Sequence, residues 1–365
     1  MSRRLVVCCD GTWSRPDQLR GGSTSPTNVW KLAFGVSAHD RDGGPQILFY
    51  QRGVGTRRFE RYRGLLFGFG LSRNVREVYR FIVENYEPGA ELYFFGFSRG
   101  AYTARSTVGL VRNVGILRPE HVDRIKDAYR LYRARQDDKK PNGVQARSFR
   151  RRYSHEEEIE IRFVGVWDTV GSLGIPLDVR VPFASKLWGF HDTALSSRVR
   201  FAYQALAIDE QRGTFKPTLW KQQEHTRGQV LEQVWFSGVH SDVGGGYPEA
   251  ELAEIALLWM VDRARSRDLA FKPDHFTTPT RVDTERRQQG QHTSPDALGA
   301  IHESDKGIYR WLPRHRRTLD RREGSNESVA SSAVRRLREK RGYDPEGLEE
   351  YVAAGRPTTQ VQDGA

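Results

Sequence analysis

Short apolar runs recur along the chain, and they predict the strands of a buried sheet. The runs lie at residues 5–10, 46–51, 91–97, 159–168, 199–209 and 230–238. The run at 91–97, ELYFFGF, is apolar at nearly every position, so we expect it to be buried on both faces. Strands of this kind are typical of a parallel sheet that is covered by helices on both sides.

Longer stretches between these runs repeat their apolar residues at helical spacing. Residues 74–86 have an apolar face made of Val75, Val78, Tyr79, Ile82, Val83 and Tyr86. Residues 248–264 form a second amphipathic stretch. Because strands alternate with helices and no hairpin signals occur, the sequence predicts an α/β fold with a doubly wound, mostly parallel sheet.

Charged and polar stretches divide the rest of the chain. We expect one domain over residues 1–270, interrupted at 119–158 by a charged helical insertion that is either a lid or a solvated excursion. Residues 271–348 are polar and are expected to form a C-terminal arm packed on that domain, with a helix at 331–342. The last segment, 349–365, is expected to be a disordered tail.

The net charge of +12, from 58 Lys and Arg against 46 Asp and Glu, narrows the classes of partner. Positive charge of this size favours anionic partners. The arginines are scattered or lie in runs of mixed sign, and no zinc-finger spacing, RNP signature or basic heptad region occurs. We therefore expect no nucleic-acid partner, and we keep peripheral contact with an anionic membrane as an expectation. The sequence says nothing of the oligomeric state.

The N-terminus and the cysteines bear on the compartment. MSRRLVVCCD contains an apolar segment of about six residues, which is too short for the core of a signal peptide. No apolar run approaches the roughly 18 residues that a membrane-spanning helix needs. Cys8 and Cys9 are sequence neighbours, so no disulfide framework is expected. These features predict a cytoplasmic protein, and specialised secretion is left open.

The clearest chemical motif is GFSRG, which places Ser98 between Gly96 and Gly100. It stands where the apolar run 91–97 gives way to a helix-compatible stretch. A sharp turn there, with glycines on both sides to avoid clashes, exposes the hydroxyl of a nucleophilic serine. The alternative is a serine that only completes a tight turn. A hydroxyl is a weak nucleophile at neutral pH, so the first interpretation requires a base and an acid elsewhere.

Asp168 and His240 meet that requirement in the chain order Ser, acid, His that α/β-hydrolase folds use. Each follows a predicted strand, and the carboxyl ends of parallel strands meet at one edge of a sheet. Asp209 also ends a predicted strand and is the second candidate for the acid; Asp168 is favoured because a glycine-containing loop follows it. For His240 the alternative is a core histidine bonded to backbone. His191 follows no predicted strand and is expected on the surface or in a lid.

Backbone N–H groups of Arg99 and of the loop at Gly11 or Thr12 are expected to form an oxyanion hole beside the serine. Asp10 and Asp242 lie near the same strand ends and are expected either to brace loops or to share a divalent cation. No Cys or His spacing typical of zinc occurs, and no glycine-rich segment matches a nucleotide-binding fingerprint. We therefore expect neither a bound metal nor a cofactor.

Six segments together resemble a known family. They are CDGTW (9–13), GVGT (53–56), GFSRGAYTAR (96–105), GVWDTVGSLG (165–174), ALAIDEQRGTFKPTLW (205–220) and VWFSGVHSDVGGGYPE (234–249). The set resembles the α/β-hydrolase domain family of bacteria and fungi that includes the catalytic domains of type VI secretion phospholipase effectors. The resemblance implies an α/β-hydrolase fold with its nucleophile at Ser98, its acid at Asp168 and its base at His240. In the effector branch it implies cleavage of phospholipid acyl esters.

The residues and the resemblance together predict a serine hydrolase that acts on carboxylic esters, with a small-molecule ester or a lipid, above all a phospholipid, as substrate. Two alternatives remain open. The same triad serves thioesterases and peptidases. A catalytically silent scaffold would instead bind an anionic membrane or a protein partner through the basic surface.

Overall fold

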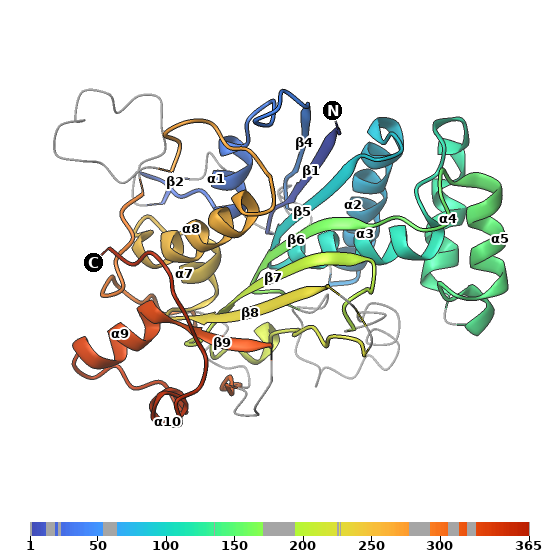
Figure 1. The fold of residues 1–365 in the computed structure, drawn as a ribbon. Helices are drawn as coiled ribbons and strands as arrows, with labels where there is room; N and C mark the ends of the chain where they lie inside the picture. Colours follow the sequence, from blue (N-terminus) through green and yellow to red (C-terminus); the bar gives the residue numbers. More distant parts are fainter. Residues whose placement is uncertain are drawn as a thin grey trace.

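The computed structural model describes residues 2–11, 19–20, 23–53, 64–134, 136–170, 194–224, 226, 228–276, 293–305, 314–319 and 326–364. Strands from these ranges form one large sheet, and helices cover both of its faces (Figure 1).

The sheet has eight strands in the order β10-β9-β8-β7-β6-β5-β1-β4, and every neighbouring pair is parallel. The strands are β1 (Arg4–Cys9), β4 (Gln46–Gln51), β5 (Glu91–Phe97), β6 (Ile161–Trp167), β7 (Val199–Ala207), β8 (Val230–Phe236), β9 (Glu327–Ala330) and β10 (Thr358–Thr359). A two-residue antiparallel pair, β2 (Leu19–Arg20) and β3 (Ser23–Thr24), is separate. The predicted doubly wound, mostly parallel sheet is confirmed.

Helices pack on the two faces. One face carries α1 (Asn28–Gly35) and α8 (Glu251–Arg265), and the other carries α2 (Gly64–Asn85) and α3 (Arg99–Val114). Along β1, Leu5 and Val7 belong to the core on the α2–α3 side, whereas Val6 and Cys8 belong to the core on the α1–α8 side. Successive side chains of a strand point to opposite faces, so burial of both faces explains why the central runs are apolar throughout.

The strand order creates a switch point between β1 and β5. The chain moves from β1 outward to β4, and then returns to the other side of β1 to form β5 and the strands that follow. In open α/β sheets, the crevice outside the carboxyl ends of the strands at such a reversal is the usual place for a ligand. Residues 10–11, after β1, and residue 98, after β5, therefore flank the expected site.

The insertion at 119–158 consists of η2 (Pro119–Arg124), α4 (Ile125–Arg133), η3 (Asp137–Lys139) and α5 (Val144–Tyr153). It packs on α3. Arg150 of α5 donates a hydrogen bond to the carbonyl of Asn113 (2.7 Å), and the hydroxyl of Ser154 donates to that of Val114 (2.6 Å). Both carbonyls lie at the end of α3 that is distant from Ser98. A lid role for this insertion stays a prediction.

The C-terminal region differs from the expectation. Residues 349–365 were expected to be disordered, yet α10 (Leu348–Ala353) and β10 are ordered within 348–364, and β10 extends the sheet beside β9. Leu348 and Tyr351 are buried against α9 (Ser331–Glu339), in a small core of their own. The polar composition concealed this order, because two apolar anchors and a strand edge are enough to hold the segment. No helix in the described ranges is both long and apolar enough to span a bilayer.

Replacing Tyr351 by Ala tests this packing. The ring is 1% exposed, and its hydroxyl donates to the carbonyl of Pro357 at 3.0 Å. Loss of a buried aromatic ring costs about 3–5 kcal/mol of unfolding free energy, and the matched Tyr351→Phe variant loses only the hydrogen bond, worth about 1 kcal/mol. Denaturant unfolding measures both. A Tyr351→Ala variant as stable as the parent would contradict a packed C-terminus.

Candidate active site

The motif around Ser98 forms a sharp elbow between β5 and α3. Ser98 has φ 57° and ψ −119°, a backbone conformation that costs energy for a residue with a Cβ. Gly96 and Gly100 are required on either side of Ser98, because the backbone nearby leaves no room for a Cβ at these positions. A Cβ at Gly100 would lie 2.0 Å from the carbonyl oxygen of Cys9, and one at Gly96 would lie 2.7 Å from the backbone of Ala101. The elbow therefore lies directly against the end of β1.

Asp168 lies beside the elbow on the neighbouring strand. Phe97 pairs in register with Trp167, and the N–H of Ser98 donates to the carbonyl of Trp167 at 3.1 Å. Asp168, the next residue, also has a positive φ of 37° and is fully buried. Two residues with strained backbones thus follow adjacent strands at one edge of the sheet, as expected from their places after the apolar runs.

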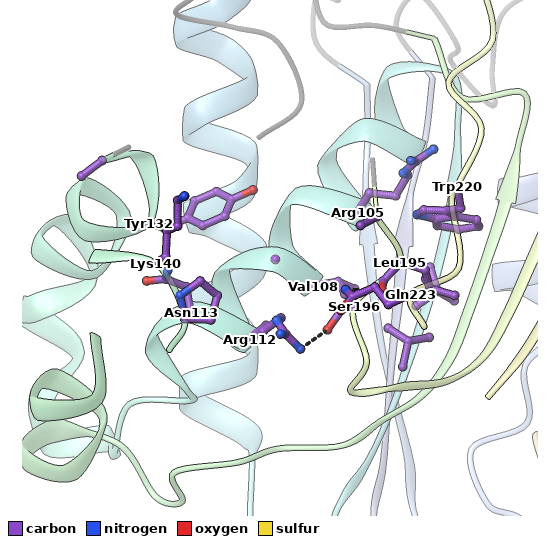
Figure 2. A pocket seen from close by; sticks show the side chains of 16 residues that line it. Arg105, Val108, Arg112, Asn113, Tyr132, Lys140, Leu195, Ser196, Trp220 and Gln223 are labelled. Carbon is purple, nitrogen blue, oxygen red and sulfur yellow. Dashed lines mark hydrogen bonds between the residues drawn. The ribbon is translucent and has the colours of Figure 1, made fainter. Parts of the chain in front are cut away.

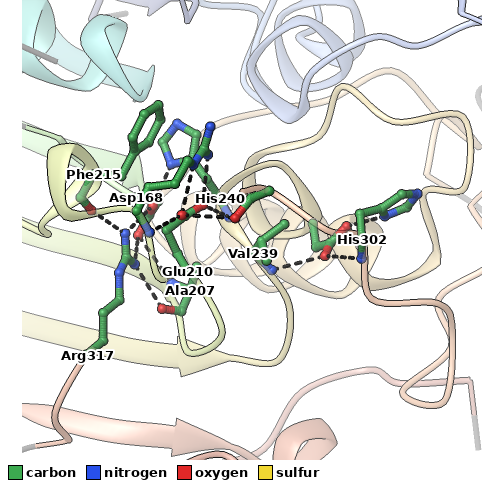
Figure 3. A network of polar contacts seen from close by, with 11 residues as sticks. Asp168, Ala207, Glu210, Phe215, Val239, His240, His302 and Arg317 are labelled. Atoms are coloured by element: carbon green, nitrogen blue, oxygen red, sulfur yellow. Dashed lines mark hydrogen bonds and ion pairs between the residues drawn. The ribbon is translucent and has the colours of Figure 1, made fainter. Parts of the chain in front are cut away.

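His240 begins the short helix α7 (His240–Gly244) after β8, and its ring reaches Asp168. The Nδ1 atom of His240 lies 2.5 Å from Oδ2 of Asp168 (Figure 3). The rings of Phe97 and Phe215 flank the imidazole at centroid distances of 4.6 and 4.8 Å. The structure therefore brings His240 and Asp168 into contact. Ser98 follows Phe97, whose ring contacts His240, and its N–H is bonded to the carbonyl of Trp167, the residue before Asp168.

The electrostatics of the pair favour a neutral imidazole and an ionised carboxylate. Burial lowers the pKa of His240 below its ordinary value, and the hydrogen bond with Asp168 opposes that shift only in part. Burial would raise the pKa of Asp168, but the charge of Arg317 and the hydrogen bond with His240 outweigh it and hold that pKa below its ordinary value. A neutral imidazole at neutral pH is the form that can accept a proton.

Two residues that the sequence analysis missed hold Asp168 and His240 in place. Arg317, from the C-terminal arm, donates to both carboxylate oxygens of Asp168, at 2.5 and 2.9 Å. Glu210, 1% exposed, accepts the backbone N–H of His240 at 3.2 Å and is itself held by Arg212 and Ser304. Arg317 lies in none of the six family segments, and Glu210 lies in one of them (205–220) but at a position that no catalytic pattern marks. Their roles depend on contacts between segments far apart in the sequence, which periodicity does not reveal.

The other carboxylates near the site brace loops. Asp209 accepts the N–H of Gly238 at 2.6 Å and the hydroxyl of Tyr343 at 3.1 Å, so it holds the loop before His240 rather than the imidazole. Asp242 accepts the N–H of Val239 at 3.0 Å and lies 2.6 Å from Nδ1 of His302. In these contacts the imidazole of His240 pairs with Asp168, the acid that the sequence analysis favoured over Asp209.

Asp10 braces the loop after β1, where part of the oxyanion hole is expected. One carboxylate oxygen accepts the N–H of Gly11 at 2.6 Å; the other accepts the hydroxyls of Thr27 (2.8 Å) and Tyr50 (2.5 Å). Burial raises the pKa of Asp10 to about 6. The N–H of Gly11 is thus bonded to Asp10 in the structure, and the expected donation from Gly11 or Thr12 to an oxyanion stays a prediction.

Of the remaining candidate residues, the structure describes Arg99 but not Thr12 or His191. Arg99 is the first residue of α3, directly after the elbow. Thr12 and His191 lie outside the described residues. Within the described ranges, no three His, Cys, Asp or Glu side chains lie close enough together to hold a metal ion.

A cavity of about 460 Å³ lies along α3 (Figure 2). Arg105 and Arg112, seven residues apart on one face of the helix, line it together with Lys140 of the insertion. Val108, Leu195 and Trp220 supply apolar walls. No Asp or Glu is among the described residues of the lining, so the cavity combines apolar surface with positive charge.

Hydrogen bonds link the wall of this cavity to the residue after Asp168, although Ser98, Asp168 and His240 are not among its lining residues. Arg105 lies over the ring of Trp220 at 4.4 Å and donates to the carbonyl of Thr218 at 2.6 Å. The N–H of Thr218 in turn donates to the carbonyl of Thr169, the residue after Asp168, at 3.0 Å. One short chain of hydrogen bonds therefore connects the cavity wall with the sheet edge that carries Asp168.

Comparison with known proteins identifies the family. A family model described as "T6SS, Phospholipase effector Tle1-like, catalytic domain" matches residues 3–263. The match covers most of the chain, and the chain belongs to this family. An uncharacterized protein of Saccharomyces cerevisiae, YEL023C, is 30% identical over 234 residues, which are 59% of this chain and 32% of that protein.

Two solved structures are also similar. An uncharacterized protein from Pseudomonas aeruginosa has 18% sequence identity and a TM-score of 0.43, over 74% of this chain and 46% of that one. The Tle1 effector, solved bound to the VgrG spike of the type 6 secretion system, has 19% identity and a TM-score of 0.35, over 68% of this chain and 52% of that one. The chain thus spans 32% of the yeast relative and about half of each solved chain.

Replacing Gly100 by Ala tests the tight contact between the elbow and β1. A methyl group 2.0 Å from a backbone oxygen forces the elbow away from β1, with an expected loss of about 3 kcal/mol in unfolding free energy. Gly89→Ala is the matched control, because Gly89 has φ 87° but no atom within 4 Å of the added methyl group. That variant is expected to lose only the backbone cost of about 1–2 kcal/mol. Equal losses in the two variants, measured by denaturant unfolding, would refute the contact.

Proposed function

We propose that this member of the Tle1-like phospholipase effector catalytic-domain family is a serine hydrolase that cleaves lipid acyl esters. Ser98 is the proposed nucleophile, His240 the base and Asp168 the acid. The observation that carries the proposal is the 2.5 Å contact between Nδ1 of His240 and Asp168, at the edge of the sheet where Ser98 forms a strained elbow. With Nδ1 engaged by a carboxylate, Nε2 is the nitrogen that accepts a proton.

The proposed reaction has two steps. The Oγ atom of Ser98 attacks the ester carbonyl carbon while Nε2 of His240 takes the hydroxyl proton. The resulting oxyanion is stabilised by backbone N–H groups, for which Arg99 and Thr12 are the proposed donors. The alcohol leaves with the proton from His240, and the acyl group stays on Ser98. Water, deprotonated by the same histidine, then releases the fatty acid and restores the serine.

The surroundings of His240 support the role of a base. Phe97 and Phe215 exclude water from two sides of the ring. The backbone N–H of His240 donates to Glu210, which fixes the start of α7. A neutral imidazole that is held in place loses little free energy to reorganisation when it accepts a proton. Because the pKa of His240 is lowered, the base stays deprotonated at neutral pH.

The cavity along α3 supports a lipid substrate. Its volume of about 460 Å³ lies in the range of ligand sites, and apolar walls with cationic groups suit an acyl lipid that carries a negative headgroup. Arg105 is seven residues after Ser98, roughly 10 Å along the helix axis, so a lipid whose ester lies at Ser98 can reach the cavity. We take the cavity as the place where the anionic part of the substrate binds.

Other acyl substrates are the second candidate. A thioester or a peptide would be cleaved by the same three residues, and a substrate panel separates these classes. The cytoplasm stays the compartment expected from the sequence, and secretion as an effector is the alternative that family membership raises.

Replacing Ser98 by Ala tests the nucleophile. The turnover of a p-nitrophenyl ester is expected to fall by a factor on the order of 10⁶, because no other group forms the acyl intermediate. Ser148→Ala, on the exposed side of α5, is the matched control and keeps full activity. A fluorophosphonate probe should label the parent protein and not Ser98→Ala. Unchanged turnover in Ser98→Ala, or a parent that neither turns over esters nor takes the probe, would rule out this function.

Replacing Arg112 by Gln tests the substrate class. Loss of one charged hydrogen-bond donor to an anionic headgroup is expected to raise KM for an anionic phospholipid roughly tenfold. The KM for the neutral p-nitrophenyl ester should not change. Arg130→Gln, on exposed α4 outside the cavity, is the control for net charge. An equal rise in KM for both substrates, or none for either, would argue against a headgroup site in the cavity.

A further inference from the structure

The C-terminal arm contributes an arginine to the candidate active site. Arg317 lies beyond the end of the family match at residue 263, in a segment that the sequence analysis treated only as polar. Its side chain is 1% exposed, and that of Asp168 is fully buried. A buried charge is costly unless it is paired and hydrogen-bonded. Arg317 and Asp168 therefore depend on each other in a way that an exposed surface ion pair does not.

The guanidinium of Arg317 is bonded on both sides. Nη1 donates to Oδ1 of Asp168 (2.5 Å) and to the carbonyl of Ala207 (2.8 Å). Nη2 donates to Oδ2 of Asp168 (2.9 Å) and to the carbonyl of Phe215 (2.7 Å). The arginine therefore joins the ends of β6 and β7 and the short helix η4 (Gly213–Phe215) to one carboxylate (Figure 3).

This geometry fixes the direction of the carboxylate. A planar fork that engages both oxygens prevents the carboxylate from rotating, which a single point charge such as lysine does not. Oδ2, which receives one prong of the fork, is also the oxygen 2.5 Å from Nδ1 of His240. The backbone of Phe215, whose ring lies against that imidazole, is held by the same guanidinium. One side chain thus positions both the acid and one wall around the base.

The charge of Arg317 has a second effect. With Arg317 present, the buried carboxylate is already neutralised while His240 is uncharged. A proton added to the imidazole then leaves the group of three side chains with a net positive charge in a dry site, which is unfavourable. Two other described charged groups act on the imidazole: Glu210, which accepts the backbone N–H of His240, and Arg212, which is paired with Glu210. Arg317 therefore discourages early protonation of the base.

The same arm reaches the edge at two further points. Nδ1 of His302 lies 2.6 Å from Asp242, and the hydroxyl of Ser304 donates to Glu210 at 3.1 Å. Asp242 and Glu210 both brace the start of α7, where His240 lies. The arm thus contacts three carboxylates that hold His240 or the start of its helix, and Arg317 makes the contact that includes the proposed catalytic acid.

We propose that Arg317 is a positioning residue of the active site, which aims the Asp168 carboxylate at His240 and keeps the imidazole unprotonated until Ser98 reacts. This inference rests on the proposed function. A purely structural role, in which Arg317 only satisfies a buried carboxylate, is the alternative. The positioning role and the structural role differ in their effect on the proton affinity of His240. In the positioning role, removing the positive charge of Arg317 raises the pH at which the buried pair of Asp168 and His240 takes up a proton.

The experiment compares Arg317→Gln, Arg317→Lys and the parent in ester hydrolysis, with kcat counted per active site titrated by the fluorophosphonate probe. Arg317→Gln is expected to lower kcat roughly ten- to a hundredfold with KM little changed, since a charged hydrogen bond to the acid is lost. The acidic limb of its pH–activity profile should lie at higher pH than that of the parent. Arg317→Lys keeps the charge but not the fork, so its kcat should fall while the acidic limb stays in place.

The neighbouring Arg316→Gln is the control, because Arg316 pairs with Glu346 in the exposed part of the arm. It should match the parent throughout. NMR titration of the His240 ring in Arg317→Gln gives a readout that needs no catalysis, and its pKa should rise. If the proposed function is wrong, the parent will not react with the probe, but the pKa of His240 will still rise in Arg317→Gln. A folded Arg317→Gln protein with the parent's kcat per labelled site and the parent's His240 pKa would overturn the inference. If Arg317→Gln does not fold, parental kcat in Arg317→Lys would overturn it.

Discussion

The structure around the candidate site depends on one buried carboxylate. Asp168 has no exposure to solvent, yet it is ionised, because Arg317, His240 and the N–H of Ala207 all bond to it. Such a group is stable only when its partners are held in place, since a buried charge without partners costs several kcal/mol. The end of β7, helix η4, helix α7 and the C-terminal arm are therefore linked through a single side chain.

The sheet supplies the frame for this link. Parallel strands bring residues 10, 98, 168 and 240 to the same edge, although the chain between them contains helices and an insertion. The strand order reverses between β1 and β5, which is where open α/β sheets usually bind a ligand. The elbow at Ser98 packs so closely on β1 that Gly100 has no room for a side chain beside Cys9 and Asp10. Ser98 and Asp168, which follow neighbouring strands of this frame, both have positive φ angles that are strained for residues with a Cβ.

Much of this frame could be predicted from the sequence. Apolar runs identified the central strands, and the order of Ser98, Asp168 and His240 after such runs indicated one edge, because position after a strand is a local property. Arg317, Glu210 and the ordered residues 348–364 were missed, since each depends on contacts that are distant in the sequence and carries no periodic signal. The bond between Gly11 and the side chain of Asp10 was missed for another reason. A glycine in a tight turn indicates backbone freedom and does not show which acceptor its N–H will find.

The central claim is that Ser98, His240 and Asp168 act together on an acyl group. A crystal structure of the protein after reaction with a fluorophosphonate tests it most directly. We expect a phosphyl group on Oγ of Ser98, with Nε2 of His240 within about 3 Å of that oxygen and Nδ1 still bonded to Asp168. An unmodified Ser98, or an adduct with the imidazole of His240 turned away and out of reach, would contradict it.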